Sequence, residues 1–439
     1  MIISRAQHPI SRALISENAL KVLHRLKDAG YASLLVGGCV RDLMLGREPK
    51  DFDVVTDARP EEIHELFRSA RLIGRRFRLA HVRFGREIIE VATFRALPRT
   101  GGDDGDAGAG TEAAEKASRL LRDNVFGTQE EDAVRRDFTI NALYYNIRDF
   151  SVMDYVGGAS DLTQGRLRII GDPETRYRED PVRMLRAVRF AAKLGFQMDA
   201  DTSRPIRDLA PLLTQVPPAR LFEEILKLFH GGYAVQTYEL LRQFGLFAFL
   251  FPRTEKSLAS EESGFPRTLI AQALSNTDTR IEQGKPVTPA FLLSVLLWYP
   301  VQEVVRRNVA QGMNPNEALI RATERLLREQ VQHVAIPKRI GVPMREIWEL
   351  QARLERRYAQ QISRLLLNPR FRAAYDLLLL RARVGDASPE LASWWTQFQD
   401  ADETRRREMS ASLIPNSGQK KRRRRRSRSK KQAQASKEG

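Results

Sequence analysis

Residues 32–55 place an apolar strand, a Gly-Gly turn, a helix and an acidic strand in immediate succession. The four signals, in chain order, are "ASLLV" at 32–36, Gly37-Gly38, "VRDLMLG" at 40–46 and "DFDVV" at 51–55. A strand that turns tightly into a helix presents backbone N–H groups to an anion such as phosphate. Together with a helix at 60–69 and a hairpin about Gly85, the segment predicts an α/β unit with a small mixed sheet.

Two carboxylates stand close together in the acidic strand. At positions i and i+2, Asp51 and Asp53 point to the same face, where they repel each other. A pair of divalent cations would compensate this repulsion, and hard oxygen ligands suit Mg²⁺, although they do not exclude Mn²⁺. Such a two-metal site activates an attacking hydroxyl and stabilises a leaving pyrophosphate. The alternative is an exposed strand face with two solvated acids.

A third carboxylate usually completes a site of this kind, and the sequence offers two candidates. Glu90 lies on the strand "EIIEVATFR", and Asp137 lies in "RRDFTINA", where it is equally suited to cap a helix. We expect Arg95 and Arg136 to face phosphate and Asn141 to face sugar or base. The following segment, "ALYYNI", is expected to continue a helix that starts at "RRDFTIN".

The segment "REDPVRMLRAVRF" predicts a basic helix face. Asp180 followed by Pro181 is typical of a helix N-cap with proline at the first helical position. Arg183, Arg186 and Arg189 recur at every third position, which places them on one side of the helix. A solvated basic face is the alternative to a nucleotide-binding one. Asp180 and Arg183 also have the hydrogen-bonding groups to read the edge of a base.

The rest of the chain is predominantly helical. The clearest helical windows from 173 to 410 are 181–194, 219–230, 236–247, 316–330 and 371–383. Residues 98–118 are rich in Gly and Asp and are expected to form a mobile loop. We divide the chain into a head at 1–165, a neck at 166–235, a body at 236–410 and a disordered tail at 411–439.

Charge and composition indicate the kind of partner. The 439 residues carry a net charge of +17, which favours an acidic polymer such as RNA. A single cysteine, Cys39, fits a reducing compartment, and we find neither a secretory signal nor an apolar stretch that spans a bilayer. We therefore expect a cytoplasmic protein without a membrane segment.

Much of the positive charge lies in one run near the C-terminal end, "KKRRRRRSRSKK" at 420–431. Contact with nucleic-acid phosphate is the favoured role because each neutralised phosphate releases a counterion. A solubilising or localisation tail is the alternative. The residues predicted to bind RNA are Lys420, Lys421, Arg422, Arg423, Arg424, Arg425 and Arg426.

Five segments together resemble a known superfamily. They are "LLVGGCVRDLMLGREPKDFDVVTDA", "EIIEVATFRA", "EEDAVRRDFTINALYYN", "DYVGGASDL" and "YREDPVRMLRAVRFAAKLG". In this order they are similar to the successive motifs of class II nucleotidyltransferases, which include bacterial poly(A) polymerases and CCA-adding enzymes. The resemblance implies an α+β fold, with a polymerase-beta-like mixed-sheet head followed by a helical neck and body.

The resemblance also implies roles for individual residues. Asp51 and Asp53 would hold the metal ions, with Asp137 or Glu90 as the third acid. The triphosphate would contact Gly37, Gly38 and Arg41, the base would contact Asp180 and Arg183, and residues 154–161 would form a hinge between head and neck.

Segments outside the head resemble the bacterial poly(A) polymerase branch. These are "LIGRRFRLAHVRFG", "PPARLFEEILKLF", "LLWYP", "AIPKR" and "FRAAYDLLLLRA". This branch implies template-independent transfer of AMP from ATP to RNA 3′ ends by a monomer, with RNA-decay proteins as a further class of partner. The alternatives are a CCA-adding tRNA nucleotidyltransferase and a non-catalytic RNA-binding protein on a degenerate copy of the fold.

Overall fold

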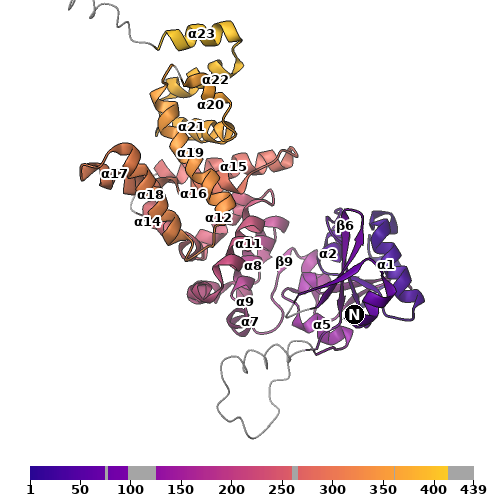
Figure 1. Ribbon diagram of the computed structural model, residues 1–439. Coiled ribbons are helices and arrows are strands. Elements are labelled where there is room, and N and C mark those ends of the chain that lie inside the picture. The colour runs from indigo at the N-terminus through magenta and orange to yellow at the C-terminus, as the bar shows by residue number, and fades with distance from the viewer. Residues whose placement is uncertain (75–77, 97–124, 260–264, 360, 414–439) are drawn as a thin grey trace, which may run out of the picture. The chain divides into compact units, whose positions relative to one another are not determined.

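The computed structural model describes residues 1–74, 78–96, 125–259, 265–359 and 361–413 (Figure 1). The chain forms two compact units, Met1–Leu213 and Thr214–Gly439. The predicted loop at 98–118 lies outside the described residues, as does the basic run at 420–431. The finer division into head, neck, body and tail stays a prediction.

An eight-stranded mixed sheet organises unit 1, with strand order β1-β8-β7-β2-β3-β6-β5-β4. The central β3 pairs with β6 in parallel, and all other neighbours in this sheet are antiparallel. The strands are β1 (Ile2–Ile3), β2 (Leu34–Val36), β3 (Asp53–Thr56), β4 (Ala70–Ile73), β5 (Leu79–Phe84), β6 (Glu87–Thr93), β7 (Leu143–Asn146) and β8 (Val152–Asp154).

Helices of unit 1 pack on this sheet and follow it in the chain. Ser16 caps α1 by accepting hydrogen bonds from the backbone N–H groups of Asn18 and Ala19, and α1 contacts β3 and β6. The helices are α1 (Glu17–Asp28), α2 (Gly38–Met44), α3 (Pro60–Leu66), α5 (Gln129–Arg135), α6 (Gly158–Thr163), α7 (Pro173–Glu179), α8 (Val182–Leu194), α9 (Ala200–Ser203) and α10 (Ile206–Leu209). A short parallel pair, β9 (Arg166–Leu167) and β10 (Gln197–Met198), lies among them.

The predicted succession of strand, turn, helix and acidic strand is confirmed by β2, α2 and β3, and the hairpin by β5 and β6. Two local predictions are wrong. Residues 143–146 form strand β7 rather than helix, and only a 3-10 turn, Thr139–Asn141, precedes them. Helix α8 begins at Val182 with Pro181 in the cap position, one residue later than predicted, although Asp180 Oδ1 does accept a hydrogen bond from Val182 N.

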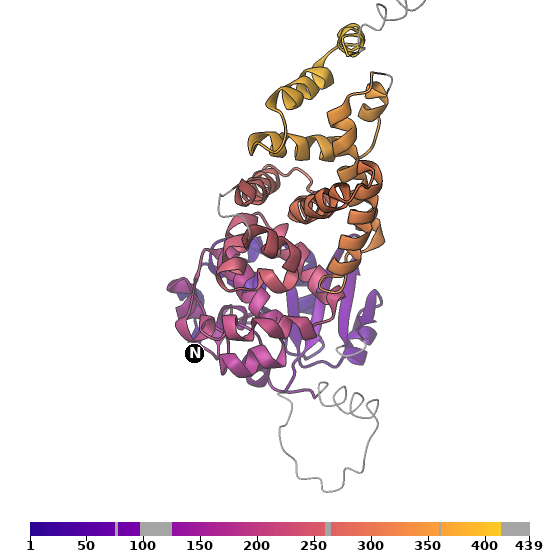
Figure 2. The ribbon, with the colours of Figure 1, turned by 90° about the vertical axis from the view of Figure 1, so that its left-hand side faces the viewer.

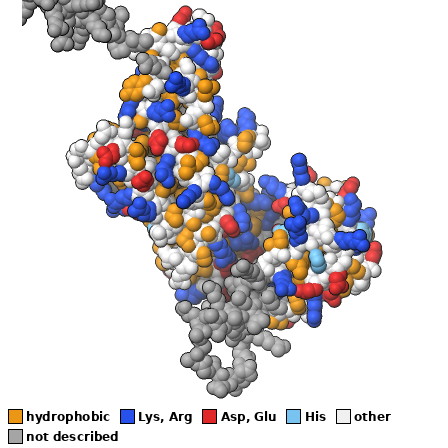
Figure 3. Space-filling model, in the orientation of Figure 1, with side chains coloured by type: hydrophobic (Ala, Val, Ile, Leu, Met, Phe, Trp, Pro, Cys, Tyr) orange, Lys and Arg blue, Asp and Glu red, His pale blue; other side chains and the backbone are white. Residues whose placement is uncertain are grey.

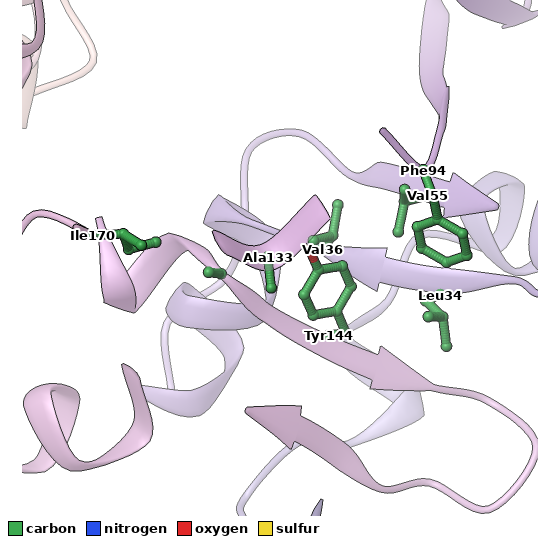
Figure 4. Close-up of a cluster of buried hydrophobic side chains, with 8 residues drawn as sticks. Leu34, Val36, Val55, Phe94, Ala133, Tyr144 and Ile170 are labelled. Atoms are coloured by element: carbon green, nitrogen blue, oxygen red, sulfur yellow. The ribbon is translucent and has the colours of Figure 1, made fainter. Parts of the chain in front are cut away.

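A buried apolar cluster joins the centre of the sheet to the elements around it. Tyr144 of β7 lies beside Val36 of β2, and Phe94 lies beside Val55 of β3 (Figure 4). The buried members are Leu34, Val36, Val55, Phe94, Ala133, Ala142, Tyr144 and Ile170. Because β2, β3 and β7 are fixed by this cluster, the side chains at their ends are held in defined positions.

In the described part of unit 2 the regular structure is helical (Figure 2). Within the described residues no helix is long and apolar enough to cross a membrane. The helices are α11 (Pro218–Phe229), α12 (Ala234–Gln243), α13 (Phe247–Leu250), α14 (Pro252–Ala259), α15 (Phe265–Glu282), α16 (Pro289–Leu296), α17 (Trp298–Ala310), α18 (Pro315–Gln330), α19 (Lys338–Arg356), α20 (Ile362–Leu366), α21 (Phe371–Arg383), α22 (Pro389–Asp400) and α23 (Glu403–Ala411).

Candidate active site

A row of paired residues crosses the middle of the sheet of unit 1. Val36 of β2 is opposite Tyr144 of β7 on one side and opposite Asp53 of β3 on the other. Asp53 in turn is in register with Glu90 of β6, which is opposite His81 of β5. Directly opposed residues direct their side chains to the same face of a sheet. Strand pairing thus brings Glu90 beside Asp53, although α3, β4 and β5 separate them in the sequence.

The Gly37-Gly38 turn lies at the end of β2, next to Asp53. Gly37 has a φ of +80°, in the region that favours glycine, and it caps α2, which begins at Gly38. A Cβ atom on Gly37 would lie 3.8 Å from Asp53 Oδ2 and 3.7 Å from Arg136 Nη1. The turn, one acid and one guanidinium therefore converge at this point.

The protein supplies few groups that stabilise the negative charge of the Asp53 carboxylate. Burial and the charge of Glu90 raise the pKa of Asp53 to about 6, with a smaller contribution from Asp51, while Arg136 opposes the rise. No described residue donates a hydrogen bond to a carboxylate oxygen of Asp53 or Asp51. Asp51 is exposed and precedes β3, which begins at Asp53, so the prediction that both acids lie within the strand is wrong for Asp51.

Arg136 is held by two groups that sequence reasoning missed. Its Nε donates to Asp132 Oδ2 over 3.1 Å and to the Tyr144 hydroxyl over 3.0 Å, and its Nη2 donates to Asp132 Oδ2 over 2.8 Å. Burial by itself would lower the pKa of Arg136, but the charge of Asp132 raises it overall. Nη1 is directed toward Gly37 and makes no hydrogen bond to a described residue. The i, i+4 spacing of Asp132 and Arg136 is the signal that could have identified this pair.

Asp137 lies in a different environment from Asp53. Its Oδ2 accepts a hydrogen bond from Arg186 Nε over 2.7 Å and a second one from Arg186 Nη2, while its Oδ1 accepts from Phe138 N and Asn141 Nδ2. Burial by itself would raise the pKa of Asp137, but Arg186 and the other donors lower it overall. The structure therefore pairs this acid with a helix of the predicted neck.

Arg41 and Asn141 continue this network into α2. Arg41 Nη1 donates to Asn141 Oδ1 over 2.7 Å, and Arg41 Nε donates to Asp42 Oδ1 over 2.8 Å. The side chain of Arg41 is only 3% exposed. Lys193 of α8 lies 3.5 Å from the other oxygen of Asp42, which links α2 directly to α8. The hydrogen bonds from Arg41 through Asn141 and Asp137 to Arg186 link the two helices a second time.

The remaining predicted residues lie on α8 or beside it. Arg183 Nη1 donates to Glu179 Oε2 and to the Arg176 carbonyl, each over 2.7 Å. Arg186 and Arg189 both lie against the Phe190 ring, with their guanidinium carbons 5.3 and 5.0 Å from its centre.

Arg95 lies just beyond the end of β6, where its backbone forms an isolated bridge with Phe126. The predicted RNA-binding residues 420–426 lie outside the described residues. Within the part of the chain that the structure describes, no group of three His, Cys, Asp or Glu side chains is arranged to hold a metal ion.

Comparison with known proteins matches three segments to family models. Residues 33–168 match the poly A polymerase head domain, 195–258 match the probable RNA and SrmB-binding site of polymerase A, and 311–430 match the polymerase A arginine-rich C-terminus. The chain is also 53% identical over 403 residues to poly(A) polymerase I of Escherichia coli O6:H1, covering 91% of this chain and 85% of that protein. The chain belongs to the bacterial poly(A) polymerase family.

Relatives outside the poly(A) polymerase family are more distant. A CCA-adding enzyme of Lactobacillus helveticus is 38% identical over 224 residues, which is 51% of this chain and 52% of that one. The solved structure of the Thermotoga maritima CCA-adding enzyme with tRNA is similar in fold, with a TM-score of 0.58 at 19% identity, covering 91% of this chain and 85% of that one. The acids, the Gly-Gly turn and Arg136 all lie within the match to the poly(A) polymerase head.

Proposed function

We propose that this chain transfers AMP from ATP to the 3′ ends of RNA, without a template, and releases pyrophosphate. The relationship to poly(A) polymerase I over most of both chains supports this activity. A copy of the fold that had lost catalysis would have no need to keep an uncompensated acid beside a Gly-Gly turn. The convergence of Asp53, Gly37 and Arg136 is the observation that carries the proposal.

Asp51 and Asp53 would hold Mg²⁺. Their donor chemistry fits this ion, because carboxylate oxygens that accept no hydrogen bond from described residues are available as hard ligands. Bound there, Mg²⁺ would neutralise triphosphate charge and activate the 3′ hydroxyl. The protein contributes the carboxylates at fixed positions, so that the hydroxyl and the α-phosphorus meet in line.

Glu90 is the third carboxylate in this proposal, and Asp137 has a positioning role. Glu90 is in register with Asp53, and its charge contributes to the raised pKa of Asp53. Asp137 already binds Arg186 and Asn141, and these partners would have to be lost before it served as a metal ligand.

The triphosphate would lie on the Gly37-Gly38 turn, with Arg136 Nη1 as its cation. Arg41 and Asn141 are proposed to fix the position of α2. Both side chains are buried and hydrogen-bonded to each other, and they also bind Asp42 and Asp137, respectively. Arg95 remains a predicted contact for phosphate. On α8, Arg186 fixes Asp137 and Arg189 packs on Phe190. Arg183 of α8 and Asp180, which precedes this helix, are proposed to recognise the base.

Primer extension tests the activity. A generic single-stranded RNA is incubated with Mg²⁺ and either ATP or CTP alone, with Asp51→Asn protein as the inactive control. Long tails from ATP and little extension with CTP are expected. Extension that stops after one or two residues, with CTP used on tRNA lacking its 3′ end, would instead assign CCA addition. Salt-sensitive RNA binding without any extension would leave an RNA-binding protein.

A further inference from the structure

A cavity of about 620 Å³ lies within the helical unit, between α15, α16, α19 and α21. These four helices pack on one another, so the cavity is built by the fold of unit 2 itself. Its volume is in the range of about 300–1,000 Å³ that is usual for ligand sites. It lies outside residues 195–258, the segment that matches a probable RNA-binding model.

Arginine dominates the charge of this cavity. Five arginines line it, against a single carboxylate, Asp376. Arg372 pairs with Asp376 at 3.1 Å, and Arg370 pairs with Glu346 at 3.0 Å. The lining arginines are Arg280, Arg339, Arg370, Arg372 and Arg383.

Two of these arginines have unpaired charge. Arg339 and Arg383 are exposed, and neither has a hydrogen bond or an ion pair with any described residue. Figure 3 shows Lys and Arg side chains over much of the visible face of the helical unit, mixed with acids, so positive charge alone does not mark a site. The cavity differs because its arginines surround a concave apolar floor.

The floor of the cavity suits a flat aromatic ligand. Phe291 at the start of α16 is half-buried and exposes part of its ring to the cavity. Aliphatic side chains from α19 and α21 contribute to the floor, and those of α19 are three or four residues apart, on one helix face. These residues are Ile340, Pro343, Ile347, Leu379 and Leu380.

We propose that this cavity binds one nucleotide of a single-stranded RNA, with the base on Phe291 and the flanking phosphates at Arg339 and Arg383. A basic groove that contains an aromatic ring is the combination that single-stranded nucleic acid requires. An acidic peptide would match the charge but would leave the ring unused. The site deepens the proposed function, on which it rests, by adding a second contact for the RNA substrate.

Binding of a labelled single-stranded RNA of about 15 nucleotides to the full chain, measured by fluorescence anisotropy without ATP, tests the proposal. The test variant carries Arg339→Gln and Arg383→Gln. The control variant carries Arg306→Gln and Arg307→Gln, two exposed arginines of α17 that do not line the cavity and that change the net charge equally. Both variants are checked for native near-ultraviolet circular dichroism.

Loss of two phosphate contacts should weaken RNA binding about tenfold more in the test variant than in the control. It should also reduce the slope of log K against log salt by about 1.4, at about 0.7 per phosphate on a single strand. Equal affinities and equal slopes in the two variants would overturn the proposal. AMP incorporation by the wild-type chain is assayed in parallel, so that a failure of the proposed function is seen separately.

The variant Phe291→Leu tests the position of the base. Stacking on an aromatic ring is sequence-tolerant and does not involve phosphate, so its loss should not change the release of counterions. We therefore expect weaker RNA binding, by about tenfold, with an unchanged salt slope. Undiminished affinity in Phe291→Leu would refute the placement of the base on this ring.

Discussion

Replacing Asp53 by Asn should stabilise the metal-free protein while abolishing AMP transfer. The pKa of Asp53 is raised from the ordinary value of 3.8 to about 6, which means that the folded state disfavours the charged carboxylate. At about 1.4 kcal/mol per pKa unit, this difference corresponds to about 3 kcal/mol. Because Asp53 is partly exposed, we take this value as a ceiling and expect a gain of about 1–3 kcal/mol at about pH 8.

The sign of the pH dependence follows from the direction of the pKa shift. Between about pH 4 and pH 6 the folded state binds more protons at Asp53 than the unfolded state does, so wild-type stability falls as the pH rises through this window. The amide introduced by Asp53→Asn is uncharged at every pH. For this reason the gain in the free energy of unfolding of Asp53→Asn over the wild type should reach its full size above about pH 6 and should vanish below about pH 4.

Urea unfolding in EDTA, followed by circular dichroism between about pH 4 and pH 8, measures this difference. Asp51→Asn is the matched control, because Asp51 is exposed and its charge is solvated. Both variants should lose AMP transfer, but Asp53→Asn should gain clearly more stability than Asp51→Asn, because Asp51 makes only the smallest contribution to the raised pKa of Asp53. A loss of stability in Asp53→Asn at the alkaline end of this range, or an equal gain in both variants, would refute the argument that Asp53 is an uncompensated charge.

Three further predictions concern the turn, the partly buried ion pair of Arg186 with Asp137, and the tail. Gly37→Ala and Gly46→Ala both place a methyl group at positive φ, so each should lose about 1–3 kcal/mol in urea unfolding, but only Gly37→Ala should also lower the rate of AMP transfer. Arg186→Met leaves Asp137 without its ion pair and should destabilise the fold by about 2 kcal/mol or more. The lowered pKa of Asp137 means that its stabilising contribution is present above its ordinary pKa and lost on acidification, so this deficit should shrink below about pH 4; a deficit unchanged with pH would contradict the pairing. Deletion of residues 418–439 should weaken RNA binding and flatten its salt dependence while single AMP additions continue, and an unchanged salt slope would contradict a role in phosphate binding.

Local sequence determined the elements around the candidate site. The Gly-Gly pair permits the positive φ at Gly37 that turns β2 into α2, and apolar spacing specifies the helices of unit 2. Strand β7 could not be predicted from the sequence, because Leu143, Tyr144 and Tyr145 are all buried. A short apolar run that is buried on both faces has no period that distinguishes a strand from a helix.

Tertiary structure decided which of these residues meet. The sequence offers Glu90 and Asp137 as equivalent third acids, but the parallel pairing of β3 with β6 places Glu90 beside Asp53, and Asp137 binds Arg186 on α8. The pKa of Asp53 likewise depends on burial and on a charge from another strand. Such contacts join residues far apart in the chain, and they are set by strand pairing and packing rather than by any local preference of the residues themselves.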